Sequence, residues 1–408
     1  MEFILRVVVI GQGYVGLTVA ISAANSGHIV FGLDINKYLI DELLIGKTQI
    51  PGIDKEQLVS LVHQARYVPT LNEEVLKDAE IVVIAVPTPL DVNREPDLSA
   101  LKAAAELISK NVTNETLIVN ESTSYPGTLR NYIKPLIEEN TSLRLNYASA
   151  PERVDPGNKD WKLNNTPRVI SGITDVATEM AINFYSSFCS KIYRASSPEV
   201  AEASKIFENT FRQINIALSN EFSEIANVIG FSATEAILAA STKPFGFMPF
   251  YPSIGVGGHC IPVDPTYLSY IAGEFGIKAK FIELANETNI NMARKVAARI
   301  QSFLNGDIDG ASIQIAGISY KPGVSDMRES PALRLIDELK LLGAQVTWHD
   351  PLVEVFEDQK SLPLNPSIDL GLIVSPHREI DFSTWVTAGT KVLDLSPNTI
   401  NTGWPKFL

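Results

Sequence analysis

The sequence predicts an α/β protein with two Rossmann-like, doubly wound parallel-sheet domains joined by a helical central region. Short β-branched runs alternate with helical stretches through the first half of the chain, and the same alternation returns from about residue 310. One long helical pattern lies between these two parts. Strands that alternate with helices pair in parallel. We expect the domains to span residues 1–196, 197–305 and 306–408.

The composition is that of a globular protein, with 45% hydrophobic and 20% charged residues among 408. The net charge of −13 argues against nucleic acid or an anionic membrane as the main partner. The two cysteines give neither a disulfide framework nor a zinc pattern, so we expect no metal. Because there is no secretory signal and no apolar run of about 18 residues, we expect a cytoplasmic protein without a membrane span.

A glycine motif follows the first predicted strand. Residues 6–10 lead into GQGYVG at 11–16, a helix follows over 17–26, and a strand over 28–33 ends on Asp34. In this context the motif predicts dinucleotide binding: Gly11 permits the tight turn, Gly13 lets the backbone approach the pyrophosphate, and Gly16 allows close helix packing. Asp34 would accept hydrogen bonds from the ribose and repel a 2′-phosphate, which favours NAD over NADP. The alternative is a glycine turn in a unit that binds nothing.

Polar residues follow three further predicted strands. The run at 81–86 ends at Pro87 and Thr88, the run at 117–120 leads to Thr123, and the run at 145–148 leads to Glu152. Each could merely cap a turn. Because ligands of open α/β sheets bind beyond the carboxyl ends of the strands, we expect these residues to line the site.

The long helix is predicted to begin near residue 197, at a capping serine followed by Pro198, and to end before Gly230. Such a helix spans about 45 Å. We expect it to connect two domains and to offer a face for a homodimer or a higher homo-oligomer. Lys205 and Asn209 lie one turn apart on one face of it. Taken alone, Lys205 could equally be a solvated charge.

The last part of the chain repeats the strand and helix pattern. Strands are expected at 312–318, 345–350, 370–374 and 391–395, with a helix over 331–342. Two nucleotide-type folds in one chain indicate one cofactor and one nucleotide-bearing substrate.

Cys260 lies in the segment GVGGHCIPVDP at 255–265. A thiol combined with a dinucleotide fold favours covalent catalysis, because a thiohemiacetal can donate hydride and become a thioester. Cys260 could instead be a small buried hydrophobe, as we expect for Cys189. We do not expect His259 to pair with the thiol, since adjacent side chains seldom converge. Asp264 is expected to start a helix whose positive end lies near the thiol.

Taken together, these motifs resemble those of the UDP-glucose/GDP-mannose dehydrogenase family of nucleotide-sugar 6-dehydrogenases from end to end. The matching segments are the glycine motif, Pro151-Glu152, AEASK at 201–205 with Asn209, GGHCIPVD at 257–264, and Tyr320-Lys321 with DMRESP at 326–331. TKPFGFMPFYP at 242–252 and HDP at 349–351 are most similar to the UDP-N-acetylglucosamine 6-dehydrogenase branch.

The resemblance implies a role for each matching residue. Cys260 matches the nucleophile, Lys205 the residue that moves the proton at the sugar C6 oxygen, and Asn209 the donor to the oxyanion. Asp264 is similar to the aspartate that supports the lysine and the hydrolytic water, and Glu152 to the acid/base that activates that water. Thr123 is expected both to take part in catalysis and to contact the cofactor. The expected cofactor contacts are Gly11, Gln12, Gly13, Tyr14, Val15, Gly16, Asp34, Pro87, Thr88, Thr123 and Arg328. The expected substrate contacts are Glu152, Arg153, Lys205, Asn209, Tyr251, Gly255, Gly257, Tyr320 and Lys321.

One position departs from the family pattern. Many UDP-glucose dehydrogenases have a second glutamate four positions after the Pro-Glu pair, where this chain has Pro156. The departure argues against UDP-glucose as the substrate and leaves Glu152 as the remaining water activator. From its position, Arg153 is expected to contact the sugar substituent.

The expected function is an NAD-dependent four-electron oxidation at C6 of a UDP-N-acetylhexosamine, foremost UDP-N-acetylglucosamine, to the uronic acid for surface polysaccharide synthesis. UDP-N-acetylmannosamine and UDP-glucose are the alternative substrates. A catalytically silent nucleotide-sugar-binding protein is a different alternative, against which the intact Lys205, Asn209, Cys260 and Asp264 argue. In a two-electron hydroxyacid dehydrogenase, a third alternative, the thiol would be idle.

Overall fold

A computed structural model describes residues 4–48, 50, 52–154, 158, 160–396 and 402–408. The chain divides into two compact units, Met1–Glu208 with Thr266–Ile277, and Asn209–Pro265 with Lys278–Leu408. The three expected domain boundaries stay a prediction. Pro156 lies outside the described residues.

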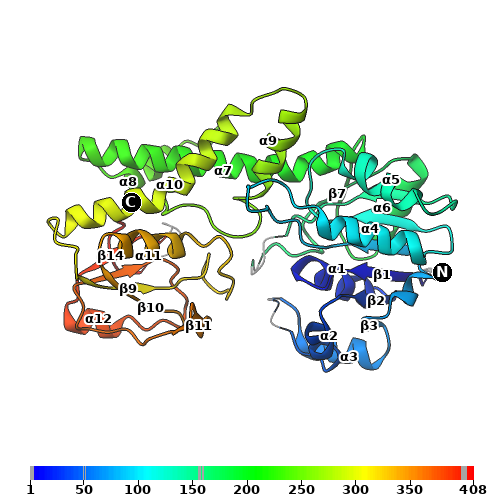
Figure 1. The fold of residues 1–408 in the computed structure, drawn as a ribbon, viewed down its shortest axis with the longest axis horizontal. Coiled ribbons are helices and arrows are strands. Elements are labelled where there is room, and N and C mark those ends of the chain that lie inside the picture. Colours follow the sequence, from blue (N-terminus) through cyan, green and yellow to red (C-terminus); the bar gives the residue numbers. More distant parts are fainter. Residues whose placement is uncertain (1–3, 49, 51, 155–157, 159, 397–401) are drawn as a thin grey trace. The chain divides into compact units, whose positions relative to one another are not determined.

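The first unit contains an eight-stranded sheet in the order β3-β2-β1-β4-β5-β6-β7-β8. Figure 1 labels β1, β2 and β3 of this sheet. All neighbouring strands pair in parallel except β6 and β7, which are antiparallel. The strands are β1 (Arg6–Ile10), β2 (Ile29–Leu33), β3 (Tyr67–Thr70), β4 (Ile81–Ile84), β5 (Leu117–Asn120), β6 (Asn146–Ser149), β7 (Arg168–Gly172) and β8 (Ile192–Arg194).

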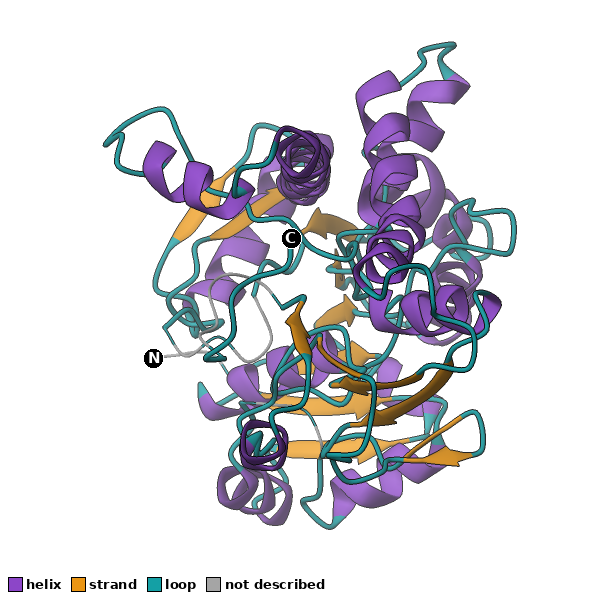
Figure 2. Cartoon of the chain, turned by 90° about the vertical axis from the view of Figure 1, so that its left-hand side faces the viewer, coloured by secondary structure: helices purple, strands orange, loops and turns teal. Residues whose placement is uncertain are grey.

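Both faces of this sheet are buried, which explains why its central strands are almost continuously apolar. Alternate residues of β1 point to opposite faces, so Val7 and Val9 belong to one core cluster and Val8 and Ile10 to another. One face is covered by α1 (Tyr14–Asn25), α3 (Lys55–His63) and α6 (Asp175–Ser186), and the other by α4 (Ser99–Asn111), η2 (Leu129–Ile133) and α5 (Lys134–Glu138). The remaining helices are α2 (Lys37–Leu44) and η1 (Glu73–Leu76). Figure 2 shows strands with helices on either side.

The second unit contains a four-stranded parallel sheet in the order β10-β9-β13-β14. Its strands are β9 (Ser312–Ala316), β10 (Gln345–His349), β13 (Leu370–Ile373) and β14 (Val392–Asp394). The helices α10 (Lys280–Phe303) and α11 (Pro331–Leu341) pack on one face and α12 (Ser383–Ala388) on the other. A two-stranded ribbon is formed by β11 (Val355–Phe356) and β12 (Gln359–Lys360).

The predicted α/β fold with parallel sheets is thus confirmed, and the strands that were expected lie within a few residues of their predicted positions. The strands β3, β7, β8, β11 and β12 were not predicted from the sequence. The long helix is α7 (Pro198–Ile229), with the bounds that the sequence predicted. The helix expected at Asp264 is α9 (Asp264–Glu274), and α8 (Ala233–Ala240) follows α7. Among the described residues, no helix is both long and apolar enough to cross a bilayer.

Candidate active site

The carboxyl ends of four neighbouring strands bring the predicted residues of the first unit to one edge of its sheet. The strands β1, β4, β5 and β6 are adjacent and parallel, so the glycine motif, Thr88, Thr123 and Glu152 follow strand ends that lie side by side. Open α/β sheets bind their ligands at this edge. These positions therefore follow neighbouring strand ends at one edge of the sheet, as the sequence predicted.

The glycine motif has the geometry of a dinucleotide site. Gly11 has a φ of 90°, and a Cβ there would collide with Ala85 O. A Cβ at Gly16 would collide with Gly11 O, so this glycine allows the close packing of α1 on the strand. A Cβ at Gly13 would meet no described protein atom within 4 Å. Packing thus explains two of the glycines, whereas the third leaves room for a phosphate before the positive end of α1. These residues fit NAD.

Asp34 follows β2 and is held beside the motif. Its carboxylate accepts hydrogen bonds from Gln12 N at 2.7 Å and Asn36 N at 2.8 Å. The side chain of Gln12, expected near the cofactor, is fully buried and contacts Tyr67 Oη, 2.7 Å from its Oε1. Only the backbone of Gln12 is therefore suited to face a cofactor.

The turn after β4 is fixed from two sides. Ser122 Oγ accepts a hydrogen bond from Val86 N and donates one to Val86 O, both at 2.9 Å, so it ties the turn to the residue before Thr123. Tyr267 of α9 donates to Thr88 O at 3.1 Å. The Pro87-Thr88 turn is thus held at the sheet edge by contacts that the sequence did not reveal.

A buried ion-pair network lies behind Glu152. Arg168 of β7 and Glu121, which follows β5, form an ion pair with side chains 3% and 0% exposed. Tyr185 of α6 donates a hydrogen bond to Glu121. Arg168 Nη1 also lies 3.6 Å from Glu152 Oε1, which accepts a hydrogen bond from Val154 N at 2.6 Å. The expected water activator is therefore held next to a buried cation.

Helix α7 places Lys205 and Asn209 one turn apart, as expected. Asn209 Nδ2 donates a hydrogen bond to the carboxylate of Asp264, which is 2% exposed. The backbone N–H of Asp264 donates to Cys260 O at 2.8 Å. These two bonds connect α7 to the segment that carries the thiol, and Asp264 begins α9 directly behind it.

Two predicted motifs meet in the second unit, since residues 255–258 pack against the segment from Tyr320 to Pro331. Gly258 N donates to Arg328 O at 3.0 Å. A Cβ at Gly257 would lie 2.8 Å from Pro331 Cδ and 2.9 Å from Tyr320 Cβ, so glycine is required for this contact. The segment of the expected nucleophile and the expected UDP-binding residues therefore pack against each other.

The Cys260 thiol has a partner that was not expected from the sequence. Cys260 Sγ lies 2.9 Å from His259 Nδ1, so the expectation that these neighbours would not converge was wrong. Adjacent side chains point apart in an extended strand, but this segment is neither helix nor strand, and Gly258 turns the chain with a φ of 88°. Cys189 is 5% exposed, as expected, and burial raises its thiol pKa to about 11.

Two buried asparagines anchor the expected substrate segment that begins at Tyr251. Asn220 of α7 accepts a hydrogen bond from Ser253 N at 2.7 Å and donates to Asn289 Oδ1 of α10 at 2.9 Å. Asn289 donates to Gln213 O at 3.1 Å. A Cβ at Gly255 would lie 2.9 Å from Asn289 O. Sequence reasoning missed both asparagines, because polar residues on a helix give no sign of being buried.

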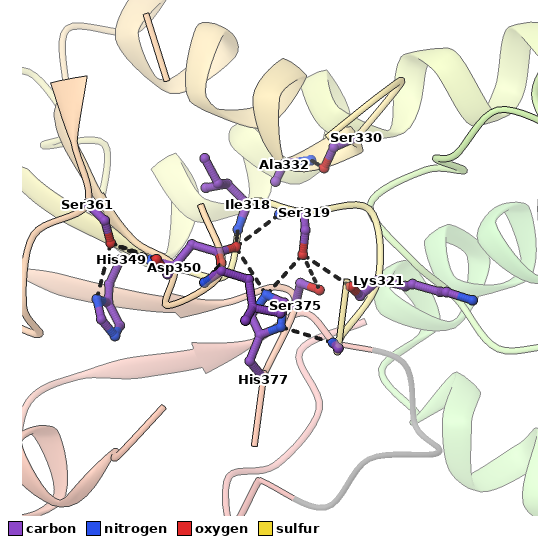
Figure 3. Close-up of polar contacts among 12 residues, drawn as sticks. Ile318, Ser319, Lys321, Ser330, Ala332, His349, Asp350, Ser361, Ser375 and His377 are labelled. Atoms are coloured by element: carbon purple, nitrogen blue, oxygen red, sulfur yellow. Dashed lines mark hydrogen bonds and ion pairs between the residues drawn. The ribbon is translucent and has the colours of Figure 1, made fainter. Parts of the chain in front are cut away.

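Figure 3 shows a buried polar cluster beside the segment that carries Lys321. His377 Nδ1 accepts a hydrogen bond from Gly323 N at 3.0 Å. His377 Nε2 lies 2.9 Å from Ser319 Oγ and 3.1 Å from Asp350 Oδ2. Because Nδ1 accepts, the imidazole proton is on Nε2 and is donated to these oxygens.

The aspartate of this cluster follows β10. Its carboxylate accepts hydrogen bonds from Ile318 N at 2.9 Å and Ser319 N at 3.2 Å. Burial alone would raise the pKa of Asp350, but the His377 side chain and the backbone N–H groups hold it below its usual value. The cluster thus fixes both ends of the turn at residues 319–323. Within this turn, Lys321 Nζ lies 5.7 Å from the centre of the Tyr320 ring.

Two predicted arginines form ion pairs. Arg153 bonds to both carboxylate oxygens of Glu208 and to Pro167 O. The Arg328 side chain makes a bidentate contact with Asp326. Their expected contacts with the sugar substituent and the cofactor stay predictions.

Known protein families match this chain along nearly its whole length. Residues 5–216 match the NAD binding domain of the UDP-glucose/GDP-mannose dehydrogenase family, residues 199–291 its central domain and residues 314–400 its UDP binding domain. The chain belongs to this family. The resemblance in the motifs is therefore confirmed, and the protein is an NAD-dependent oxidoreductase of nucleotide sugars.

Relatives that act on two epimeric sugars are similarly distant. The chain is 34% identical to the UDP-N-acetyl-D-glucosamine 6-dehydrogenase of Pseudomonas aeruginosa over 370 residues, which cover 89% of this chain and 86% of the relative. It is 37% identical to the UDP-N-acetyl-D-mannosamine dehydrogenase of Methanococcus maripaludis (strain C7) over 361 residues, with coverages of 87% and 81%. The solved UDP-D-ManNAc dehydrogenase of Pyrococcus horikoshii has a TM-score of 0.87 at 31% identity, covering 98% of this chain and 97% of its own.

Proposed function

We propose that this protein oxidises the C6 hydroxyl of a UDP-N-acetylhexosamine, UDP-N-acetylglucosamine foremost, to the uronic acid by way of a Cys260 thioester, for surface polysaccharide synthesis. The packing of the Cys260 segment against Tyr320 and Pro331 carries the proposal, because it sets a thiol next to residues that match a UDP binding domain. A two-electron dehydrogenase has no use for that thiol.

The identity of the sugar is a separate part of the proposal. Relatives named for UDP-N-acetylglucosamine and for UDP-N-acetylmannosamine support an N-acetylhexosamine equally. The segments 242–252 and 349–351 favour the glucosamine epimer. UDP-N-acetylmannosamine is the second candidate, which the similarity to the Pyrococcus horikoshii structure favours.

The side chains divide the chemistry among them. NAD, when bound, supplies the hydride acceptor for each of the two oxidations. Lys205 takes the proton of the C6 hydroxyl as the aldehyde forms. Cys260 then attacks the aldehyde carbon, and an Asn209 N–H stabilises the oxygen that gains the electron pair, an effect of about 3 kcal/mol for one good donor. An amide has two such N–H groups, and the bond from Asn209 to Asp264 orients them.

Release of the product needs water. After the second hydride has left, the thioester carbon is attacked by a water molecule whose proton passes to Glu152. The carbon–sulfur bond then breaks and frees the uronic acid. The contact with Arg168 Nη1 and the hydrogen bond from Val154 N hold the Glu152 carboxylate in place for this step.

Stoichiometry tests the proposal directly. The protein is supplied with NAD and, in turn, UDP-N-acetylglucosamine, UDP-N-acetylmannosamine and UDP-glucose, and both NADH and sugar products are quantified. Two NADH per uronic acid are expected, fastest with UDP-N-acetylglucosamine. One NADH per sugar would exclude the thioester route, and none with any sugar would indicate a silent binding protein.

A cysteine pair provides the matched control. Cys260→Ser should stop uronic acid formation, because serine is not a thiolate nucleophile. Cys189→Ser should retain it, since Cys189 is packed in the apolar core of the first unit and no step of the reaction is proposed for its thiol. Normal uronic acid production by Cys260→Ser would contradict the proposal.

We also propose that two copies of the chain associate through α7. Phe211, Leu218 and Ile225 are 42%, 62% and 48% exposed and are spaced by seven residues, which places them in one apolar stripe of the coiled-coil type. Leu218→Glu should convert a dimer to a monomer in light scattering. Arg212→Ala, at an exposed position of the same helix outside the stripe, should leave the dimer intact. A monomeric wild type would contradict the proposal.

A further inference from the structure

We infer that His259 is the proton partner of Cys260: its imidazole takes the thiol proton when the sulfur attacks and returns it when the sulfur leaves. This inference rests on the proposed function, which identifies the carbon that the sulfur attacks. The pairing itself stands on the geometry of the second unit.

The local backbone makes this pairing specific. The contact joins Sγ of Cys260 to Nδ1 of His259 at 2.9 Å, within the distance at which a proton is shared. Gly258 fixes the turn before the pair, through its positive φ and its bond to Arg328 O. On the other side, Val263 N and Asp264 N both donate to Cys260 O. The two side chains are therefore held together by backbone that is anchored before and after them.

Asp326 and Arg328 are charged residues whose electrostatic effects bear on the pair. The charge of His259 affects the ionisation of the Asp326 carboxylate. Burial raises the pKa of Asp326, but hydrogen bonds from Arg328 and the positive charges of Arg328 and His259 outweigh burial and hold it below its usual value. A negative Asp326 in turn stabilises the protonated imidazole. The positive charge of Arg328 has the opposite effect on the imidazole, but the Arg328 guanidinium already forms an ion pair with Asp326.

The proposed proton transfers balance at each step. When the sulfur–carbon bond forms at C6, the S–H proton moves to His259 Nδ1 and the carbonyl electron pair moves to oxygen. That oxygen takes back the proton that Lys205 removed from the C6 hydroxyl and becomes the thiohemiacetal hydroxyl. When water cleaves the thioester, the carbon–sulfur bond breaks and the leaving thiolate takes the proton back from His259. The imidazole ends the cycle as it began, and no other reactant is needed.

The pairing is tested without substrate, so that its failure differs from failure of the proposed function. Iodoacetamide modification of Cys260 is followed by peptide mass spectrometry between about pH 6 and 10, because only the thiolate reacts and an unassisted thiol titrates near pH ~8.5. In the wild type, modification at about pH 6.5 should be at least tenfold faster than in His259→Asn, and the two rates should converge near pH ~9.5.

Superimposable pH profiles for the wild type and His259→Asn would overturn the inference. So would a Lys205→Met variant that alone abolishes the reactivity at low pH, because the cation would then be the lysine. Cys189 serves as the internal control, since its modification should be slow in every variant.

A second measurement does not depend on the fold of a His259 variant. The five histidines are followed by NMR pH titration in the wild type and in Cys260→Ala. One resonance should shift its titration midpoint on loss of the thiol, because two groups that share a proton titrate together. Five unchanged midpoints would overturn the inference.

Discussion

Arg168 and Glu121 form an ion pair that is sealed inside the first unit, with side chains only 3% and 0% exposed. Tyr185 donates a hydrogen bond to the carboxylate, and its ring lies 5.0 Å from the guanidinium carbon of Arg168. Burial raises the pKa of Glu121, whereas the charge of Arg168 lowers it. The carboxylate is therefore stable as an anion in this place only while the arginine is present.

Replacement of Arg168 should lower the stability of the folded protein. Arg168→Met leaves a carboxylate without its cation, which is expected to cost about 3–5 kcal/mol of unfolding free energy in urea denaturation. Arg168→Met combined with Glu121→Gln should recover most of this loss, because the glutamine is neutral and still accepts from Tyr185. Equal destabilisation of the single and the double variant would show that the ion pair is not the cause.

The same arginine should affect product release through Glu152. Arg168→Lys keeps a positive charge but has no planar fork to reach both carboxylates. We expect its second half-reaction, thioester hydrolysis, to slow by about tenfold in single-turnover experiments, while the first hydride transfer changes little. An equal loss in both half-reactions would indicate a general structural defect instead.

Glu202 is a second buried carboxylate with a measurable consequence. It accepts hydrogen bonds from Gly127 N at 2.7 Å and Leu129 N at 2.9 Å, and burial raises its pKa to about 8. Between the ordinary glutamate value of about 4.3 and 8, the folded state binds more protons than the unfolded state. The contribution of Glu202 to stability is therefore complete below that window and is lost as the pH rises through it.

Glu202→Gln cannot ionise and separates this effect from other titrations. Relative to the variant, the wild type should lose on the order of 3 kcal/mol of unfolding free energy between pH ~5 and pH ~8. Urea denaturation at several pH values measures the difference. Parallel stability curves for the two proteins would mean that Glu202 remains ionised in the folded state.

Local patterns in the sequence predicted the bounds of α7 and of the central strands but not the partners of the buried charges. The bounds of α7 follow from Ser197, Pro198 and Gly230, which act within one turn of the helix ends. The ion pair joins Arg168 on β7 to Glu121, which follows β5 and is 47 positions away in the chain. No local signal in the sequence distinguishes a buried arginine from a surface one. His259 was misjudged for a related reason, because the turn at Gly258 depends on a bond to Arg328 O.

Asp34 should determine the choice of cofactor. Its carboxylate is fixed by the backbone N–H groups of Gln12 and Asn36, so it presents a negative charge at a set position after β2. Asp34→Ala should raise the KM for NAD by about tenfold and weaken discrimination against NADP, since the ribose loses an acceptor and the 2′-phosphate meets no repulsion. Unchanged KM values for both cofactors would place the ribose elsewhere.

His377 should act on substrate affinity without taking part in the chemistry. Its two ring nitrogens bond to Gly323 N on one side and to Ser319 and Asp350 on the other, so it holds the turn that carries Lys321 (Figure 3). His377→Ala removes one buried donor to Asp350 and the acceptor for Gly323 N, so it loosens the turn. The KM for the UDP-sugar should rise by about tenfold at nearly constant kcat, because the lost order costs binding and not the reaction step. His377→Gln, which offers both an acceptor and a donor, should recover part of the affinity. A kcat that falls as far as the KM rises would show that the cluster supports the reacting residues instead.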